Sequence, residues 1–242
     1  MINLNDKVIL ITGAAGGIGR ALAQRAVEAG AFVAALDVRA EVHDLAGPQV
    51  LTLQVDATDE GQVSAALRDV SERWGRLDVL VNNAGRVGCG RVEEVALEDW
   101  NALLATNLTS VFLFAKHAIP LLRESCGAMV NMSSTNGLTG GSHLSGPAYA
   151  VAKAGIIALT KNLARDLASD GVRVNCVAPG PVDTPMLDRL GEEGRANLRA
   201  SIPLGELATT DDVANAVFFL ASDAAKHITG VTLSLSGGLI MR

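Results

Sequence analysis

Two side chains with complementary chemistry lie four residues apart in the segment Tyr149-Ala-Val-Ala-Lys153. Tyr149 is the only tyrosine of the chain, and the segment has a helical pattern. Residues at this spacing share one face of a helix, so an ammonium group would lie close to a phenol. A phenol has a pKa near ~10, and a neighbouring cation favours its ionised form. The pair is therefore suited to moving a proton when an alcohol and a ketone interconvert.

A glycine-rich turn follows the first predicted strand and reads Thr12-Gly-Ala-Ala-Gly-Gly-Ile-Gly19. Tight turns collect glycine for conformational reasons alone. Here, however, the turn leads into a helical pattern, and a helix N-terminus offers free N–H groups and a positive dipole end to an anion. We expect the pyrophosphate of a dinucleotide to bind against Gly13, Gly17, Ile18 and Gly19.

Asp37 ends the second predicted strand, 18 residues after Gly19. A carboxylate at this place can bind both hydroxyls of an adenosine ribose and would repel a 2′-phosphate. Arg39 could offset that repulsion, but Ala15 and Gly16 add no second cation in the loop. We therefore expect NAD rather than NADP as cofactor, the alternative being that Asp37 is only a turn residue.

Short apolar runs alternate with longer helical patterns along the chain. The predicted strands are 7–12, 31–37, 50–56, 79–82, 129–132, 173–178 and 231–235. Helical patterns follow Gly17, start at a capping-box pair of Asp59 and Gln62, and cover 98–123, 147–168 and 211–221. This alternation predicts an α/β fold, a doubly wound parallel β-sheet with helices on both faces, which is a Rossmann fold.

The chain is expected to form one domain over residues 1–242, because it has no internal repeat, low-complexity tract or break in composition. Its least regular segment, 184–208, mixes charged residues with two glycines and Pro203. That segment is either a flexible lid over the substrate or a solvated insertion of helix and loop.

Composition excludes several classes of protein. The 242 residues carry 20 basic and 26 acidic side chains, a net charge of −6, which argues against nucleic-acid binding. We find no apolar run approaching the ~20 residues of a membrane helix, no signal peptide, no cluster at metal-ligand spacing and no Gly-x-Ser-x-Gly motif. Three widely spaced cysteines, Cys89, Cys126 and Cys176, suit free thiols. We therefore expect a cytoplasmic protein that binds neither metal, nucleic acid nor membrane.

Further motifs occur in order around these signals: Asn82-Asn-Ala-Gly85, Asn107, Asn131-Met-Ser-Ser134, and Pro179-Gly180 with Thr184. Together with the glycine-rich turn and the Tyr149–Lys153 pair, they resemble the short-chain dehydrogenase/reductase family, in its single-domain branch of about this length. The motifs span most of the chain, and their combination is far more specific than any one of them.

The resemblance implies a catalytic set. Ser134 would hydrogen-bond the substrate oxygen, and Tyr149 would transfer the proton. Lys153 would bind the ribose and lower the pKa of the tyrosine, and Asn107 would hold a water in a proton relay from Lys153.

The resemblance also implies where the cofactor binds. The adenosine side would meet Asp56, Ala57, Asn83, Ala84 and Gly85. The nicotinamide carboxamide would be held beyond Pro179 and Gly180, by Val182 and Thr184.

One spacing departs from the family pattern. Ser134 precedes Tyr149 by 15 residues, slightly more than usual, and the usual interval would select Asn136. We interpret 137–146 as a longer substrate loop with Ser134 in the serine role, the alternatives being Ser133 or Asn136. His143 lies in this loop and is a candidate for substrate contact.

The leading hypothesis is an NAD-dependent oxidoreductase that interconverts a small secondary alcohol (a polyol, sugar-like or cyclic alcohol) and its ketone. The alternatives are a 3-oxoacyl-thioester reductase that acts with acyl carrier protein and NADPH, and an NAD-sensing protein without catalysis. Segments 98–123 and 147–168 carry apolar residues on more than one face, and the resemblance implies a homotetramer built on them.

Overall fold

A seven-stranded β-sheet, parallel throughout, runs through the computed structural model, which describes residues 3–241. The strand order is β3-β2-β1-β4-β5-β6-β7. This arrangement confirms the predicted doubly wound fold. The strands are β1 (Val8–Thr12), β2 (Phe32–Asp37), β3 (Val50–Gln54), β4 (Val79–Asn82), β5 (Ala128–Met132), β6 (Arg173–Pro179) and β7 (Thr232–Leu235).

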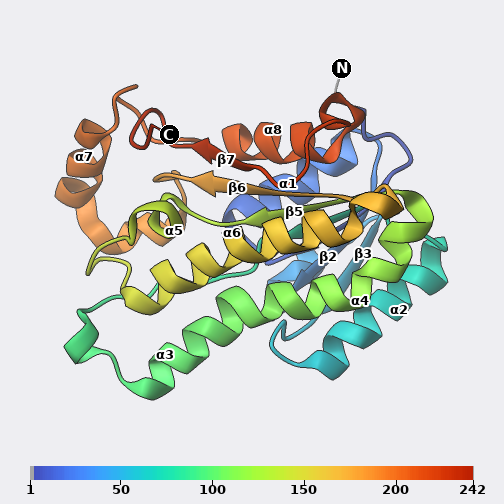
Figure 1. Cartoon of the computed structure of the whole chain (residues 1–242), viewed down its shortest axis with the longest axis horizontal. Coiled ribbons are helices and arrows are strands. Elements are labelled where there is room, and N and C mark those ends of the chain that lie inside the picture. The colour runs from blue at the N-terminus through green and yellow to red at the C-terminus, as the bar shows by residue number, and fades with distance from the viewer. Residues whose placement is uncertain (1–2, 242) are drawn as a thin grey trace.

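Helices cover both faces of the sheet (Figure 1). The helices are α1 (Gly17–Glu28), α2 (Glu60–Trp74), α3 (Leu97–Leu104), α4 (Ser110–Ser125), α5 (Thr135–Thr139), α6 (Pro147–Leu167), α7 (Gly191–Ser201) and α8 (Thr210–Ala221). Alternate residues of β1 point to opposite faces: Ile9 and Ile11 pack with α1 and α8, whereas Val8 and Leu10 pack with α2, α4 and α6. Short 3₁₀ turns lie at η1 (Ala40–Leu45), η2 (Val92–Glu94), η4 (Ala168–Asp170), η5 (Pro185–Leu190) and η6 (Asp223–Ala225).

The strand order reverses beside β1. The chain continues from β1 to β2 and β3 on one side, and then returns to place β4 on the other side. In open α/β sheets a ligand binds in the crevice that this reversal leaves at the carboxyl ends of the strands. The glycine-rich turn after β1 lies at that crevice.

The predicted strand 50–56 ends early, at Gln54, and although the Val55 N–H still donates to the Asp37 carbonyl at 2.8 Å, the pairing does not continue to Asp56. The N–H of Asp56 donates to the Gln62 side chain at 2.9 Å instead of to a strand. Gln62 is itself held by the cap of α2, where its N–H donates to Asp59 at 3.1 Å. The predicted N-cap at Asp59 is therefore confirmed, but the Gln62 side chain accepts from Asp56 and not from the Asp59 N–H, so the reciprocal half of the capping box does not form.

The predicted continuous helix 98–123 is interrupted. A π-helical turn, η3 (Ala105–Thr109), separates α3 from α4. The side chain of Asn107 enters the helix here, and its Nδ2 donates to the carbonyl of Leu103 at 3.0 Å. Single turns of this kind are frequent at functional sites and leave the hydrophobic periodicity almost unchanged, so the pattern did not reveal it.

The stretch Leu97–Ser125, which contains α3 and α4, is long and apolar enough to cross a membrane by length and composition alone. In its most apolar window 44% of the residues are buried inside the fold. The apolar residues of α4 cover the sheet, which explains the composition without a bilayer.

The irregular segment 184–208 contains η5 and α7. Arg195 on α7 forms ion pairs with Asp183 and Asp188 and so ties the helix to the chain that leaves β6. The segment returns to the sheet where Val182 and Ala208 form a parallel bridge.

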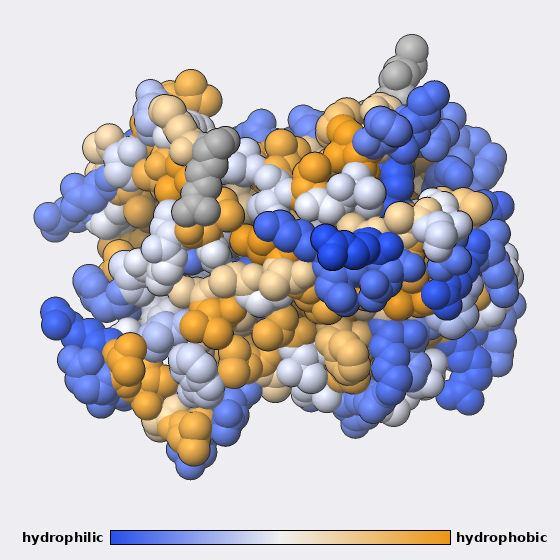
Figure 2. Space-filling view, viewed as in Figure 1, coloured by the Kyte–Doolittle hydropathy of each residue, from blue (hydrophilic) through white to orange (hydrophobic). Residues whose placement is uncertain are grey.

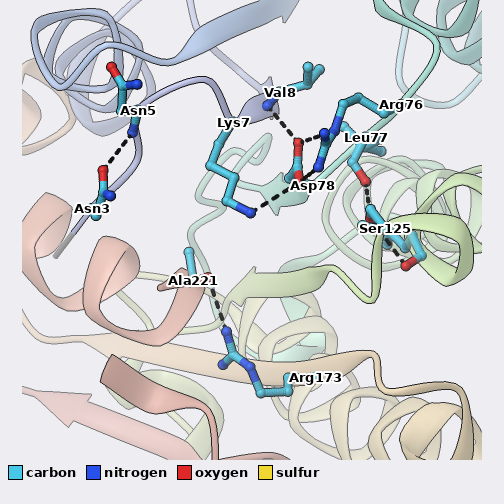
Figure 3. A network of polar contacts seen from close by, with 11 residues as sticks. Asn3, Asn5, Lys7, Val8, Arg76, Leu77, Asp78, Ser125, Arg173 and Ala221 are labelled. Atoms are coloured by element: carbon cyan, nitrogen blue, oxygen red, sulfur yellow. Dashed lines mark hydrogen bonds and ion pairs between the residues drawn. The ribbon is translucent and has the colours of Figure 1, made fainter. Parts of the chain in front are cut away.

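A buried carboxylate organises the amino-terminal edge of the sheet (Figure 3). Asp78, just before β4, accepts hydrogen bonds from the N–H of Val8 at 2.9 Å and from Arg76 Nε at 3.0 Å. Lys7 Nζ lies 3.4 Å from the same carboxylate. Two cations and one amide therefore hold the starts of β1 and β4 together.

Candidate active site

A cavity of about 830 Å³ opens at the carboxyl edge of the sheet. This volume lies within the range of small-ligand and cofactor sites. Its walls come from the turns after β1, β2, β3, β4, β5 and β6 and from the segment that contains η5 and α7. Most of the residues that the sequence singled out line it.

The glycine-rich turn is packed too closely for side chains at two positions. A Cβ on Gly13, whose φ is +69°, would lie 2.9 Å from Ala84 Cα, and a Cβ on Gly19 would lie 2.0 Å from the Gly13 carbonyl oxygen. Gly16 caps α1 without a side-chain hydrogen bond, so the first N–H groups of the helix are not capped by a side chain. The turn thus presents bare backbone at the start of a helix, which is the arrangement that binds phosphate.

The motif after β4 supports this turn from the side. Asn83 Nδ2 donates to the carbonyls of Thr12 and Gly13 at 2.9 and 3.2 Å. In return, Thr12 Oγ1 accepts from the N–H groups of Asn83 and Ala84 at 3.0 and 2.9 Å. These bonds cross the point where the strand order reverses and hold its two sides in register.

Asp37 lies at the end of β2 and its carboxylate is fixed on both oxygens. One oxygen accepts from the Ala15 N–H at 2.9 Å, and the other accepts from the Arg39 N–H at 3.0 Å. The Arg39 guanidinium also pairs with Asp37, at 3.4 Å, and lies against Gly16. Asp56 and Ala57 line the same end of the cavity, so this end contains the two carboxylates predicted to meet adenosine.

Tyr149 and Lys153 lie on α6 and line the cavity together. Lys153 Nζ is 5.6 Å from the centroid of the Tyr149 ring. Burial raises the pKa of Tyr149, whereas a hydrogen bond from Ser134 and the charge of Arg189 lower it. Burial outweighs these effects, so the phenol is the favoured form at neutral pH.

Lys153 is a buried cation, 4% exposed, and within residues 3–241 its ammonium has one hydrogen-bond partner. Its ammonium donates to the carbonyl of Met132, at the end of β5, at 2.7 Å. Burial lowers its pKa from 10.5 to about 8. An ammonium has three donors, so two remain for a ligand in the cavity that Lys153 lines.

The serine positions after β5 have different surroundings. The Ser134 hydroxyl lies where it lowers the pKa of the Tyr149 phenol, whereas Ser133 Oγ is buried and donates to the Lys153 carbonyl at 2.7 Å. Asn136 lines the cavity in the first turn of α5, where its N–H donates to Ser134 Oγ at 3.2 Å. The longer loop between Ser134 and Tyr149 is taken up by α5 and the turns after it, so the two side chains still meet.

Asn107 is fully buried in the π-helical turn. Its Nδ2 donates to the Arg86 carbonyl at 3.0 Å, and its Oδ1 accepts from the Arg86 N–H at 3.2 Å. A Cβ on Gly85 would lie 2.6 Å from Asn107 Oδ1 and 3.5 Å from Lys153 Nζ. The absence of a side chain at Gly85 thus leaves room between the amide and the ammonium.

The chain after β6 completes the wall. Pro179, Gly180, Val182 and Thr184 all line the cavity. The methyl group of Thr184 faces Gly17, since a Cβ added there would lie 3.8 Å from Thr184 Cγ2. This segment therefore lies across from the glycine-rich turn.

His143 is exposed and does not belong to the residues that line the cavity. Its carbonyl accepts from the Gly90 N–H at 2.9 Å, which joins the substrate loop to the chain after β4. Cys89 is also exposed and outside the lining. No group of three or more His, Cys, Asp or Glu side chains in residues 3–241 is placed to hold a metal ion.

Sequence reasoning missed several residues that line the cavity beyond Ser134 and Tyr149. Arg189 lines the cavity beside four apolar side chains, Leu144, Met186, Leu187 and Leu190. The only signal was the mixture of charged and apolar residues in 184–208, which does not say which of them turn inward.

Comparison with known proteins finds relatives that match almost the whole chain. A family model described as enoyl-(acyl carrier protein) reductase matches residues 13–240. The chain is 36% identical over 245 residues to the 3-oxoacyl-[acyl-carrier-protein] reductase FabG of Salmonella typhimurium. It is 38% identical over 248 residues to the protein of that name from Thermotoga maritima. Both alignments cover 99% of this chain and 100% of the relative. The ligand-free aldohexose dehydrogenase of Thermoplasma acidophilum superposes with a TM-score of 0.91 at 33% identity, covering 99% of this chain and 96% of that one.

Proposed function

Because the chain belongs to the short-chain dehydrogenase/reductase family of oxidoreductases, we propose that it transfers a hydride between NAD and a small secondary alcohol or the matching ketone. A polyol, a sugar-like alcohol or a cyclic alcohol is the proposed substrate class. The observation that carries the proposal is the single cavity that joins Asp37, the glycine-rich turn and the Ser134–Tyr149–Lys153 group.

The glycine-rich turn and the uncapped start of α1 bind the pyrophosphate, and Asp37 and Asp56 meet the adenosine. Lys153 donates to the ribose with its two remaining N–H groups, and Val182 and Thr184 hold the carboxamide. When bound, the nicotinamide ring takes up or delivers the hydride.

Tyr149 moves the proton at its phenolic oxygen. In ketone reduction the phenol donates a proton to the carbonyl oxygen, while Ser134 Oγ hydrogen-bonds that oxygen. In alcohol oxidation the phenolate accepts the hydroxyl proton. Because the pKa of Tyr149 is raised, the protein alone favours the proton donor, and oxidation speeds up as pH rises. Asn107 holds a water that relays a proton from Lys153.

The choice of NAD rests on the adenosine end. Both oxygens of Asp37 are already fixed by the loop, and the charge of Arg39 is engaged by Asp37 instead of being free for a 2′-phosphate. A phosphate dianion is usually bound by more than one cation.

The first experiment needs no substrate: parallel titrations with NADH and NADPH, followed by nucleotide fluorescence. We expect NADH to bind at least about tenfold tighter, and Asp37→Ala to remove that preference. Arg39→Gln is the matched control and should leave NADH affinity within about twofold. A screen of secondary alcohols with NAD⁺ then tests the reaction. Equal or tighter binding of NADPH would contradict the choice of NAD, and binding of neither would contradict the cofactor site.

A second candidate is a 3-oxoacyl-thioester reductase that uses NADPH and acyl carrier protein, because the FabG relatives carry that name. The turns after α4 and α6 argue against docking of acyl carrier protein, because neither turn contains a cation that an acidic carrier would need. They read Glu124-Ser-Cys-Gly127 and Ala168-Ser-Asp-Gly171, and Arg123 next to the first turn is paired with Asp170 at 2.7 Å. NADPH-dependent reduction of an acetoacetyl thioester would favour this candidate. A sensor without catalysis, the third possibility, would bind NADH and turn over neither substrate class.

The chain forms a single domain over residues 1–242, in which 184–208 acts as a lid on the substrate end.

It assembles as a homotetramer through α4 and α6. Phe112 and Val151, on these helices, are 50% and 48% exposed, and Figure 2 shows apolar side chains gathered over this face. Light scattering tests the assembly, since Phe112→Glu should lower the molar mass in solution. The protein is proposed to be cytoplasmic, because its three cysteines are free thiols and free thiols are typical of a reducing compartment.

A further inference from the structure

Arg189 bridges the two walls of the substrate end of the cavity. It lies on η5 and lines the cavity, and its Nη1 donates to the carbonyl of Leu144 at 2.7 Å, in the loop before α6. Thr184, at the start of the same segment, faces Gly17 of the glycine-rich turn instead. The segment therefore presents Thr184 to the cofactor side and Arg189 to the side of Ser134 and Tyr149.

Among residues 3–241 the charge of Arg189 has no counter-ion. Within residues 3–241 no carboxylate lies within ion-pair distance of it, whereas the neighbouring Arg195 pairs with both Asp183 and Asp188. The carboxylates that line the cavity are Asp37, which ends β2, and Asp56, which follows β3, and both lie at the end proposed for adenosine.

The surroundings of Arg189 make an anionic ligand favourable. Leu144, Met186, Leu187 and Leu190 line the cavity with it, and Arg189 is exposed, so an anion entering from solution can reach its guanidinium. The charge of Arg189 acts at the proton-transfer residue, because it lowers the pKa of Tyr149. Arg86 also lines the cavity, beside Gly85, but no such effect on Tyr149 comes from it.

We propose that Arg189 binds the carboxylate of the substrate, so that the enzyme acts on a small hydroxy acid or the matching oxo acid. This proposal rests on the proposed oxidoreductase function, and within the small secondary alcohols and ketones it selects those that carry a carboxylate in place of the neutral polyols, sugar-like and cyclic alcohols. A guanidinium binds a carboxylate through paired N–H donors, and the Leu144 carbonyl occupies only Nη1. The reacting oxygen then lies between Ser134 and Tyr149 while the carboxylate is held by η5.

The test compares acids with their neutral methyl esters: pyruvate, acetoacetate and levulinate, which place the carbonyl progressively further from the carboxylate. NADH oxidation is followed for the wild type, Arg189→Gln and Arg189→Lys. We expect at least one acid to be preferred over its ester, and Arg189→Gln to raise the KM for that acid by about tenfold or more. The KM for the ester should stay within about twofold, and Arg189→Lys should retain part of the preference.

Two control variants test whether the preference for acid over ester depends on Arg189 itself. Arg199→Gln removes the same charge from α7 outside the cavity lining, and Arg86→Gln removes another cation that lines it. Neither should change the preference of the enzyme for acid over ester. If Arg86→Gln and not Arg189→Gln abolishes that preference, the proposal is wrong.

A binding experiment separates this proposal from the proposed function. The same acids are titrated into the NADH complex of Tyr149→Phe, with and without Arg189→Gln, and nucleotide fluorescence is recorded. Weaker acid binding in the double variant supports the role of Arg189 even if no carbonyl compound of the panel is reduced. Equal binding in the two proteins, or an ester preferred by the wild type, overturns it while leaving the oxidoreductase function intact.

Discussion

A buried charge has many partners at the amino-terminal edge of the sheet and few at the carboxyl edge. At the amino-terminal edge the Asp78 side chain, 2% exposed, is surrounded by Lys7, Arg76 and the Val8 N–H (Figure 3). At the carboxyl edge Lys153 is as deeply buried but has a single carbonyl partner, and within the described chain no carboxylate forms an ion pair with it.

This difference separates a structural charge from a functional one. A buried charge that is fully paired holds elements together, and removing one of the partners strongly lowers the free energy of unfolding. A buried charge that is left under-paired shifts its own pKa and is available to a ligand, which is typical of active sites. Substitutions at the carboxyl edge should therefore reduce activity without reducing stability, and those at the amino-terminal edge should do the reverse.

The largest expected effect is that of Tyr149→Phe. Loss of the phenolic oxygen removes the proton donor and acceptor and should lower kcat by roughly a thousandfold. NADH affinity and melting temperature should be unchanged, because the ring still packs on α6. Turnover within about tenfold of the wild type would show that another group transfers the proton.

Ser134→Ala should lower kcat by about a hundredfold, since it removes a hydrogen bond to the reacting oxygen. It also removes the N-cap of α5, where Ser134 accepts from the Asn136 N–H. Ser133→Ala is the control, because that hydroxyl contacts the Lys153 carbonyl instead of the phenol. A larger loss of kcat in Ser133→Ala than in Ser134→Ala would reverse the assignment.

Asp78→Ala should lower the free energy of unfolding by about 3 kcal/mol, because it leaves the buried Val8 N–H and two cations without an acceptor. Urea unfolding measures this change, and nucleotide titration should give an unchanged NADH affinity. If Asp78→Ala keeps its stability but loses NADH binding, the charge at the amino-terminal edge is not structural and the distinction between the two edges is wrong.

Lys153→Met tests the under-paired charge. The pKa of Lys153 is about 8 in the folded protein and 10.5 ordinarily. Between these values the unfolded chain binds more protons, so the free energy of unfolding of the wild type rises with pH. The penalty is fully present below pH 8 and disappears toward pH 10.5.

That rise, on the order of 3 kcal/mol, should be missing in Lys153→Met. The variant should also be at least as stable as the wild type at pH 7, although it binds NADH more weakly. Urea unfolding of both proteins at pH 7 and pH 10 measures the difference. Parallel pH dependence in the two proteins would mean that the buried ammonium carries no such penalty.

The smallest effect is expected for Arg76→Gln. Its guanidinium is half exposed, and Lys7 and the Val8 N–H remain on Asp78. The loss should therefore be below about 1 kcal/mol in urea unfolding. A loss as large as that of Asp78→Ala would show that Arg76 alone holds this edge.

Much of the end of the cavity where we propose that the cofactor binds was predictable, because its signals are local. Gly13 and Gly19 are required by backbone contacts within a few residues of chain or across adjacent strands. Asp37 follows directly from the end of a strand, and Tyr149 and Lys153 are fixed by helical spacing. The substrate end was not predictable in this way, because 184–208 has no strong periodicity and its side chains are selected by long-range contacts.

The sequence by itself determined the alternation of strands and helices, the glycine-rich turn, the cap at Asp59 and the spacing of the Tyr149–Lys153 pair, because each depends on neighbours in the chain. Only the tertiary structure decided that Ser134 and not Ser133 acts on the phenol, that Asn107 opens a π-helical turn, and that Arg189 lines the cavity with no ion-pair partner in the described part of the chain. These outcomes depend on which groups from distant segments share a buried volume, and a one-dimensional pattern does not record that.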